Sequence, residues 1–234
     1  MSLLSIYNAS TGYGNKQVLF DINLDVEEGD TILLVGSNGS GKSTLLKLIY
    51  GLVDVWQGSV DYDGEVLHDM GKKTPTHTLL KKGIMYVPQK NELFDDASVL
   101  ENLQFSLLHL NNRKESAKRI DEVMEEMPLL KERRTQTAGR LSGGERKMLA
   151  LGMVMVNRPK LLLYDEPLAG LSEDKVPEVL DMLGRIQGKG ATILFVEHRI
   201  LELSSFASCI LGLKLGCLHI EKLNSIDNIK NIMI

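Results

Sequence analysis

Cysteine is scarce in this chain, with Cys209 and Cys217 the only two among 234 residues. Two cysteines lack the number and the spacing of a disulfide framework or a zinc site. Their scarcity fits a reducing compartment, and we expect both to be buried thiols.

An excess of positive charge is also lacking. Lys and Arg number 27 against 31 Asp and Glu, the formal net charge is -4, and no long basic run occurs. The broad positive field with which a general nucleic-acid binder displaces counterions is therefore missing. We do not expect nucleic acid as a partner.

Long hydrophobic runs are missing as well. The longest apolar stretch, residues 148–156, is about half of the roughly 20 residues that a helix needs to cross a bilayer. The amino terminus has no basic region followed by an apolar run, as a secretory signal would. We expect a cytoplasmic protein that reaches a membrane only as a peripheral subunit, through a partner.

The rest of the composition is that of an ordinary globular protein, 43% apolar and 25% charged. Alternation over residues 3–28, broken by glycines, is typical of short antiparallel strands. Residues 89–157 have the charged, periodic character of helices and no convincing strand. Short apolar runs typical of central parallel strands occur at residues 31–35, 83–87, 161–164 and 192–196.

The loop after the first of these runs reads GSNGSGKS and matches the P-loop pattern. Its glycines let successive amide groups turn inward toward phosphate oxygens, at the positive end of the following helix. Lys42 would neutralise charge on the β- and γ-phosphates, and the Ser43 hydroxyl would ligate magnesium. The expected nucleotide-binding residues here are Gly36, Ser37, Asn38, Gly39, Ser40, Gly41, Lys42, Ser43 and Thr44.

The P-loop alone does not distinguish kinases, GTPases and motor ATPases, but a second acidic motif narrows the choice. The apolar run at residues 161–164 ends in Asp165 and Glu166. Beside the P-loop strand, Asp165 would lie near the magnesium and Glu166 would polarise the attacking water as a general base. A polar turn after a strand is the alternative, and the P-loop favours the functional interpretation.

A third motif, LSGGE at residues 141–145, opens an apolar-rich helix. Ser142 is a good N-cap, and Gly143 and Gly144 leave amides open to an anion at the helix start. A helix that is merely capped by Ser142 and has a flexible start would show the same residues. The order of the motifs along the chain decides between these two interpretations.

In that order the chain resembles the ATP-binding-cassette family, from near residue 3 to about residue 218. The resemblance implies that Tyr13 stacks on adenine, that Gln89 in YVPQ contacts magnesium and hinges the helical segment, and that His198 in VEHR reaches the γ-phosphate. It also implies that GSNGSGKS, LSGGE, Asp165 and Glu166 are the phosphate loop, the family signature and the magnesium and catalytic acids.

The fold implied is α/β: a P-loop NTPase core with a mostly parallel central sheet, an N-terminal antiparallel β subdomain and an inserted helical subdomain. We expect one domain over residues 1–234, with the core in residues 1–88 and 158–234 and the helical subdomain in residues 89–157.

The resemblance further implies a mechanism that needs two subunits, either two copies of this chain or this chain with a related cassette. One subunit binds MgATP through Lys42, and Ser142, Gly143 and Gly144 of the other cap the γ-phosphate, so that closure depends on that phosphate. The implied catalytic residues are Lys42, Gln89, Glu166 and His198, and the implied magnesium ligands are Ser43, Gln89 and Asp165. Ser172 stands where many members have an aspartate facing the partner subunit, which leaves the role of that loop open.

The stretch ERRTQTAGRLSGGERKMLALG, followed by DEPLAGL, resembles cassettes of branched-chain amino-acid importers more than those of multidrug exporters. This implies an integral membrane permease as partner, on the inner face of the cell membrane, and a solute-binding protein acting through it. The cargo stays open, because related cassettes move urea or lipopolysaccharide.

Two other classes of function remain as alternatives. A soluble cassette ATPase of the iron-sulfur assembly type is one of them. A repair ATPase is disfavoured because Lys42 and Ser142 are about 100 residues apart, too close for an intervening long coiled coil. A nucleotide-gated binding module without turnover is disfavoured by Glu166 and His198.

Overall fold

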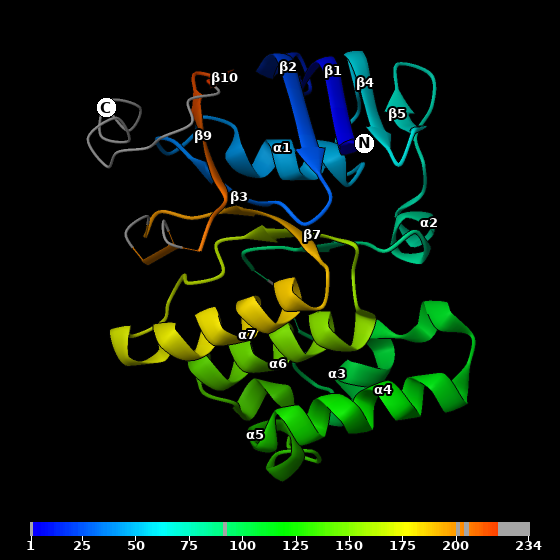
Figure 1. Cartoon of the computed structure of the whole chain (residues 1–234), viewed down its shortest axis with the longest axis vertical. Helices are drawn as coiled ribbons and strands as arrows, with labels where there is room; N and C mark the ends of the chain where they lie inside the picture. The colour runs from blue at the N-terminus through cyan, green and yellow to red at the C-terminus, as the bar shows by residue number, and fades with distance from the viewer. Residues whose placement is uncertain (1, 91–92, 200–201, 204–205, 220–234) are drawn as a thin grey trace.

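The computed structural model describes residues 2–90, 93–199, 202–203 and 206–219. An antiparallel sheet, the helix α1 (Lys42–Ile49), a mostly parallel sheet and a group of helices lie one above the other (Figure 1). This arrangement confirms the fold class expected from the sequence.

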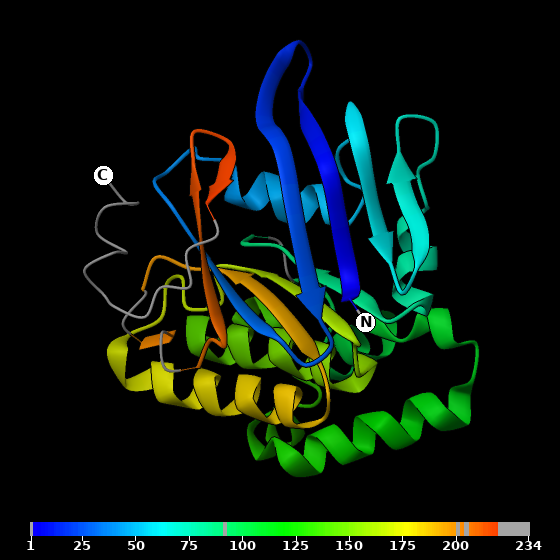
Figure 2. The same cartoon turned by 45° about the horizontal axis from the view of Figure 1, so that its top comes forward.

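The antiparallel sheet has four strands in the order β2-β1-β4-β5. The sequence pattern indicated several short strands over residues 3–28, whereas the structure has one long hairpin of two twelve-residue strands (Figure 2). The difference arises because Gly12 lies inside the first strand, and only Gly14, with φ of 57°, lies in the tight turn. The strands are β1 (Ser2–Tyr13), β2 (Lys16–Glu27), β4 (Gln57–Tyr62) and β5 (Glu65–Asp69).

The central sheet has six strands in the order β10-β9-β3-β8-β7-β6, all parallel to their neighbours except β10. Four of these strands, β3, β6, β7 and β8, coincide with the apolar runs of the sequence to within one residue at either end. The strands are β3 (Thr31–Val35), β6 (Ile84–Val87), β7 (Leu161–Asp165), β8 (Thr192–Val196), β9 (Cys209–Lys214) and β10 (Cys217–His219).

The central strands are buried on both faces, and alternate side chains enter two hydrophobic cores. Leu34 and Leu163 pack with α1 (Lys42–Ile49) and the antiparallel sheet. Leu33 and Leu162 pack on the opposite side, with α6 (Gly143–Asn157) and α7 (Val176–Gly188). Burial of both faces is why these strands read as continuous apolar runs rather than as alternating ones.

The short helix α2 (Thr76–Lys81) precedes β6, and most of the helices lie between β6 and β7 in the sequence. They are α3 (Val99–Ser106), α4 (Arg113–Glu126), α5 (Pro128–Glu132) and α6. We keep as a proposal that residues 89–157 form a helical subdomain inserted into a core of residues 1–88 and 158–234, of which 220–234 lie outside the described residues.

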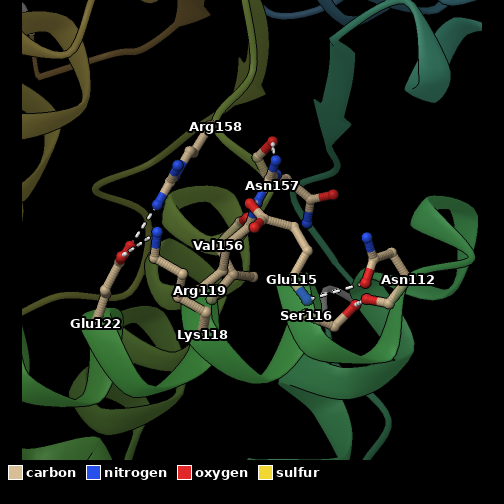
Figure 3. A network of polar contacts seen from close by, with 9 residues as sticks. All are labelled: Asn112, Glu115, Ser116, Lys118, Arg119, Glu122, Val156, Asn157 and Arg158. Atoms are coloured by element: carbon tan, nitrogen blue, oxygen red, sulfur yellow. Dashed lines mark hydrogen bonds and ion pairs between the residues drawn. The ribbon is translucent and has the colours of Figure 1, made fainter.

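A polar network joins α4 to the carboxyl end of α6 (Figure 3). Arg119 pairs with Glu115 at 2.7 Å and donates hydrogen bonds to the carbonyls of Val156 and Asn157 at 3.4 and 3.5 Å. A cation at the carboxyl end of a helix is favourable because that end carries partial negative charge. The network therefore fixes α4 to the helix that begins with the LSGG motif.

The two cysteines are not both buried, and that expectation was wrong. Cys217 is exposed and Cys209 is half-buried. Cys217 lies on β10, which is the edge strand of the described sheet and pairs there with β9. Among the described residues, no helix combines the length and the apolar character that a membrane crossing requires.

Candidate active site

The phosphate loop connects β3 to α1 and requires glycine at two positions. A Cβ on Gly36 would lie 2.2 Å from the carbonyl oxygen of Leu213 on β9. Gly41 has a φ of 108°, and its Cβ would lie 2.6 Å from Leu19 Cδ2. The loop thus packs directly on its neighbours while its tip, Ser37–Gly39, is exposed. Such a loop presents backbone to a ligand rather than side chains.

Lys42 begins α1, and its side chain turns back into this loop. Its Nζ donates to the carbonyl oxygens of Gly36 at 2.9 Å and Ser37 at 3.0 Å. Burial lowers the pKa of Lys42, and the nearby carboxylates of Glu166 and Asp165 oppose that shift. The structure therefore holds a buried cation inside the curve of the loop.

Ser40 directly follows the exposed tip of the loop and is buried. Its amide donates to the Ser37 carbonyl at 3.2 Å, and its own carbonyl accepts from Gly216 at 3.0 Å. Its contribution is therefore to the shape of the loop.

Asp165 is the last residue of β7 and lies beside the start of α1. Its Oδ1 accepts a hydrogen bond from the Ser43 hydroxyl at 3.0 Å, and its Oδ2 accepts one from Tyr86 at 3.5 Å. Burial raises the pKa of Asp165, and the Ser43 hydrogen bond opposes the rise. A hydroxyl and a carboxylate side by side are oxygen ligands of the kind that Mg²⁺ takes in nucleotide sites.

Glu166 follows Asp165 and turns sharply out of the strand, with a φ of 56°. Its amide donates to the Val196 carbonyl at 2.9 Å, which fixes the turn to the end of β8. One carboxylate oxygen accepts from the Gln89 amide, and the other lies 3.4 Å from His198 Nε2. The carboxylate is thus flanked by both residues that the family resemblance implied.

These side chains meet because each comes from the carboxyl end of one of four adjacent parallel strands. Gln89 follows β6, Asp165 ends β7, His198 follows β8 and the phosphate loop follows β3. The carboxyl ends of parallel strands are where open α/β sheets bind ligands.

Tyr13 lies at the end of β1, with its hydroxyl 3.5 Å from Thr44 Oγ1 in the first turn of α1. Its side chain is about half exposed, at 48%. An aromatic face is therefore open next to the helix that follows the phosphate loop, where the resemblance implied stacking on adenine.

The LSGG motif lies elsewhere in the chain, at the start of α6. Ser142 caps the helix: its Oγ accepts from the Glu145 amide at 3.3 Å, and its own amide donates to Glu145 Oε2 at 2.8 Å. Gly143 faces open space. Because α6 packs on the opposite face of the central sheet from α1, these contacts within one chain do not bring the motif to Lys42.

Two polar residues at the site were missed by the sequence analysis. Tyr86 contacts Asp165 from β6, and burial raises its pKa well above the ordinary value. Glu197 lies between β8 and His198 and is buried. The charge of Glu197 directly after a buried apolar run was the available signal, whereas Tyr86 was hidden inside an ordinary strand pattern.

The residues present fit a nucleotide with magnesium. Gly36 and Gly41 leave no room for side chains in the wall of the loop, Lys42 supplies a cation within its curve, and Ser43 with Asp165 supplies hard oxygen ligands. These are the donors that a triphosphate and its divalent ion need.

Comparisons with known proteins agree with this chemistry. Residues 19–169, more than half of the chain, match the family model "ABC transporter". The high-affinity branched-chain amino acid transport ATP-binding protein BraG of Pseudomonas aeruginosa is 37% identical over 196 residues, which cover 84% of this chain and 82% of that protein. The probable branched-chain amino acid transport ATP-binding protein LivF of Archaeoglobus fulgidus is 36% identical over 209 residues, covering 88% and 86%.

A solved structure shows the same architecture. A nucleotide-free ATP-binding cassette from an ABC transporter superposes with a TM-score of 0.83 at 26% identity, covering 99% of this chain and 95% of that one. Together with the relatives, it accounts for both sheets and the helical segment. The chain belongs to the ATP-binding-cassette family and is the ATP-binding subunit, an ATPase, of an ABC transporter.

Proposed function

We propose that Lys42, Ser43, Gln89, Asp165, Glu166 and His198 form the site that hydrolyses MgATP. The observation that carries the proposal is the Glu166 carboxylate, held between Gln89 and His198 next to the Ser43–Asp165 pair. A general base, an ion site and a cation for the phosphates are then adjacent.

Each residue has a separate role in the proposed reaction. Lys42 and the loop amides bind the β- and γ-phosphates and balance their charge. Glu166 accepts the proton of the water whose oxygen attacks the γ-phosphorus, while the bond to the bridging oxygen breaks and ADP leaves. Gln89 and His198 orient the Glu166 carboxylate, and His198 also donates toward the γ-phosphate. Bound through Ser43, Gln89 and Asp165, Mg²⁺ would neutralise phosphate charge.

The same proposal requires a second cassette. Ser142, Gly143 and Gly144 present a capped helix start to solvent on the face away from Lys42. A helix start with open amides is a site for an anion. We therefore assign these residues to the γ-phosphate held by the facing subunit, so that hydrolysis releases the contact.

The partner that the pair of cassettes would drive is an integral membrane permease, which would hold them on the inner face of the membrane. An exposed groove of about 440 Å³ lies where the chain leaves β6 for the helical segment. Phe94 and Phe105 line it with their rings 5.4 Å apart and are 57% and 41% exposed. Exposed apolar patches rimmed by polar residues mark protein contacts, so we assign this groove to a short helix of the permease.

The cargo we propose is an amino acid or a related solute, imported with the help of a solute-binding protein. The support comes from the two curated relatives, both named for branched-chain amino acid transport.

The hydrolysis part is tested by steady-state ATP turnover. Glu166→Gln removes the proton acceptor, so we expect kcat to fall at least about a hundredfold while ATP still binds. Turnover near wild type in this variant would remove Glu166 from the proposed role.

The transport part is tested by gentle detergent extraction of the tagged chain and by uptake of labelled leucine in cells lacking it. We expect a polytopic membrane protein to copurify and uptake to fall. Copurification with soluble proteins alone would favour the iron-sulfur or other non-transport alternative.

A further inference from the structure

Glu197 is a buried carboxylate that the proposed mechanism does not use. Its residue is 3% exposed, and it lies between the last residue of β8 and His198. A buried carboxylate is costly unless hydrogen bonds satisfy it, so its partners indicate what it does.

Those partners come from two different loops. Oε2 accepts from the amide of Leu168, in the loop that follows Glu166, at 2.9 Å. Oε1 accepts from the amide of His198 at 2.7 Å and from that of Arg199 at 3.3 Å. One carboxylate therefore joins the backbone behind the proposed base to the backbone that carries the histidine.

A second contact joins the same two loops farther out. The guanidinium of Arg199 donates to the Leu171 carbonyl at 3.2 Å, while its Nε donates to Glu202 at 3.0 Å. The loop after β7 and the loop after β8 are thus held together at Leu168 and again at Leu171.

We infer that Glu197 is a positioning residue for hydrolysis, which holds His198 against Glu166 by fixing their two loops to each other. This rests on the roles proposed for Glu166 and His198. The 3.4 Å separation of His198 Nε2 and Glu166 Oε1 is set by backbone on both sides, since each residue follows a different strand. Loss of the Glu197 hydrogen bonds would let the imidazole of His198 move relative to the carboxylate of Glu166, and the phosphate loop would stay in place.

The test is Glu197→Gln, which preserves the size of the side chain. The amide keeps one acceptor oxygen and replaces the other by an NH₂ group, so one of the two loops loses its partner. We expect kcat for ATP to fall on the order of tenfold to a hundredfold, as misplacement by about 1 Å does, with KM changed less than about twofold. Glu197→Asp, which restores two acceptor oxygens on a shorter arm, should recover part of the loss.

Two further variants distinguish a positioning role of Glu197 from a general disturbance of the fold. Asp181→Asn makes the same chemical change on the surface of α7, where Asp181 pairs with Arg185, and should leave turnover unchanged. In a His198→Ala background, Glu197→Gln should cost less than about twofold more, because the step it supports is already lost.

If Glu197→Gln turns over ATP at the wild-type rate while His198→Ala is slow, the inference about Glu197 is wrong and the proposed hydrolysis site is unaffected. If Glu197→Gln lowers kcat by the same factor in the wild-type and His198→Ala backgrounds, the inference is also wrong, because Glu197 then acts independently of His198. A rise in KM that matches the loss of turnover would point to a disturbed binding loop and would also contradict it. Wild-type turnover in His198→Ala would instead remove the proposed role of His198, and this inference with it.

Discussion

The buried charges around the phosphate loop come at some cost in stability. Burial lowers the pKa of Lys42 and raises that of Asp165, so each charged form is disfavoured relative to water. Their mutual attraction and the Ser43 hydroxyl offset part of this cost. Such a site is expected to be less stable than an uncharged one of the same shape.

Asp165→Asn should therefore stabilise the chain while it removes activity. The folded-state pKa of Asp165 lies above the ordinary 3.8, so its ionised form at pH 7 opposes folding, and the opposition disappears below that ordinary value. We expect Tm at pH 7 to rise by about 2–4 °C, which corresponds to roughly 1 kcal/mol for a chain of this size. A calorimetric scan measures it, and a lower Tm would show that the ionised group stabilises the fold.

At the scale of elements, a buried histidine joins the end of α1 to β5. His68 is 1% exposed; its Nδ1 accepts from the Thr74 amide at 3.2 Å, and its Nε2 lies 3.2 Å from the Ile49 carbonyl. The first bond requires an unprotonated Nδ1, so the proton is on Nε2 and the ring is neutral. Burial lowers the pKa of His68, and Lys73 and Lys72 add to the shift while the Ile49 carbonyl opposes it.

This joint should make folding sensitive to acid. Because the folded pKa lies below the ordinary 6.5, stability from the neutral ring is complete above pH 6.5 and is lost as pH falls toward the folded value. One proton changes the free energy of unfolding by at most about 1.4 kcal/mol per pH unit. We expect the free energy of unfolding of His68→Gln, measured in urea between pH 7 and 5, to fall less steeply than that of the wild type. Equal slopes would contradict the prediction.

The attachment of α4 to α6 gives a second test at this scale. Arg119→Ala removes the cation from the carboxyl end of α6 and the pair with Glu115 (Figure 3), so we expect a loss of about 1 kcal/mol in the free energy of unfolding. Lys118→Ala is the matched control, because the Lys118 side chain is 69% exposed and its ion pair with Glu122 is long, at 4.0 Å. This change should alter the free energy of unfolding by less than about 0.5 kcal/mol. Equal effects of the two changes would show that the bonds to Val156 and Asn157 contribute nothing.

How far the sequence predicts these elements depends on what buries them. Strands β3 and β8 were predicted residue for residue because both faces are buried and each run is apolar after its first residue, a threonine. Strands β9 and β10 were missed, since Gly212 interrupts one and the other has three residues on an exposed edge. The contact of Tyr86 with Asp165 joins residues 79 positions apart, and only the pairing of β6 with β7 creates it.

At the scale of the whole molecule, the groove at Phe94 should decide whether the chain binds the membrane permease that we propose as its partner. Phe94→Asp places a charge among Asp95, Asp96 and Glu101, so we expect copurification of the permease to fall at least tenfold, or about 1.4 kcal/mol. Leu215→Asp is the control, because Leu215 is 81% exposed in the turn between β9 and β10 and should leave copurification unchanged. Full copurification by the Phe94 variant would place the partner elsewhere.

The central claim is that ATP is held from two sides, by the loop around Lys42 and by the start of α6 in a facing molecule. The direct measurement is the mass in solution of Glu166→Gln saturated with MgATP, by light scattering. We predict twice the 26.0 kDa of one chain, and a return to 26.0 kDa when Ser142→Arg is added to block the helix start. A Glu166→Gln protein that binds MgATP and stays at 26.0 kDa, both alone and when mixed with a related cassette, would contradict the account.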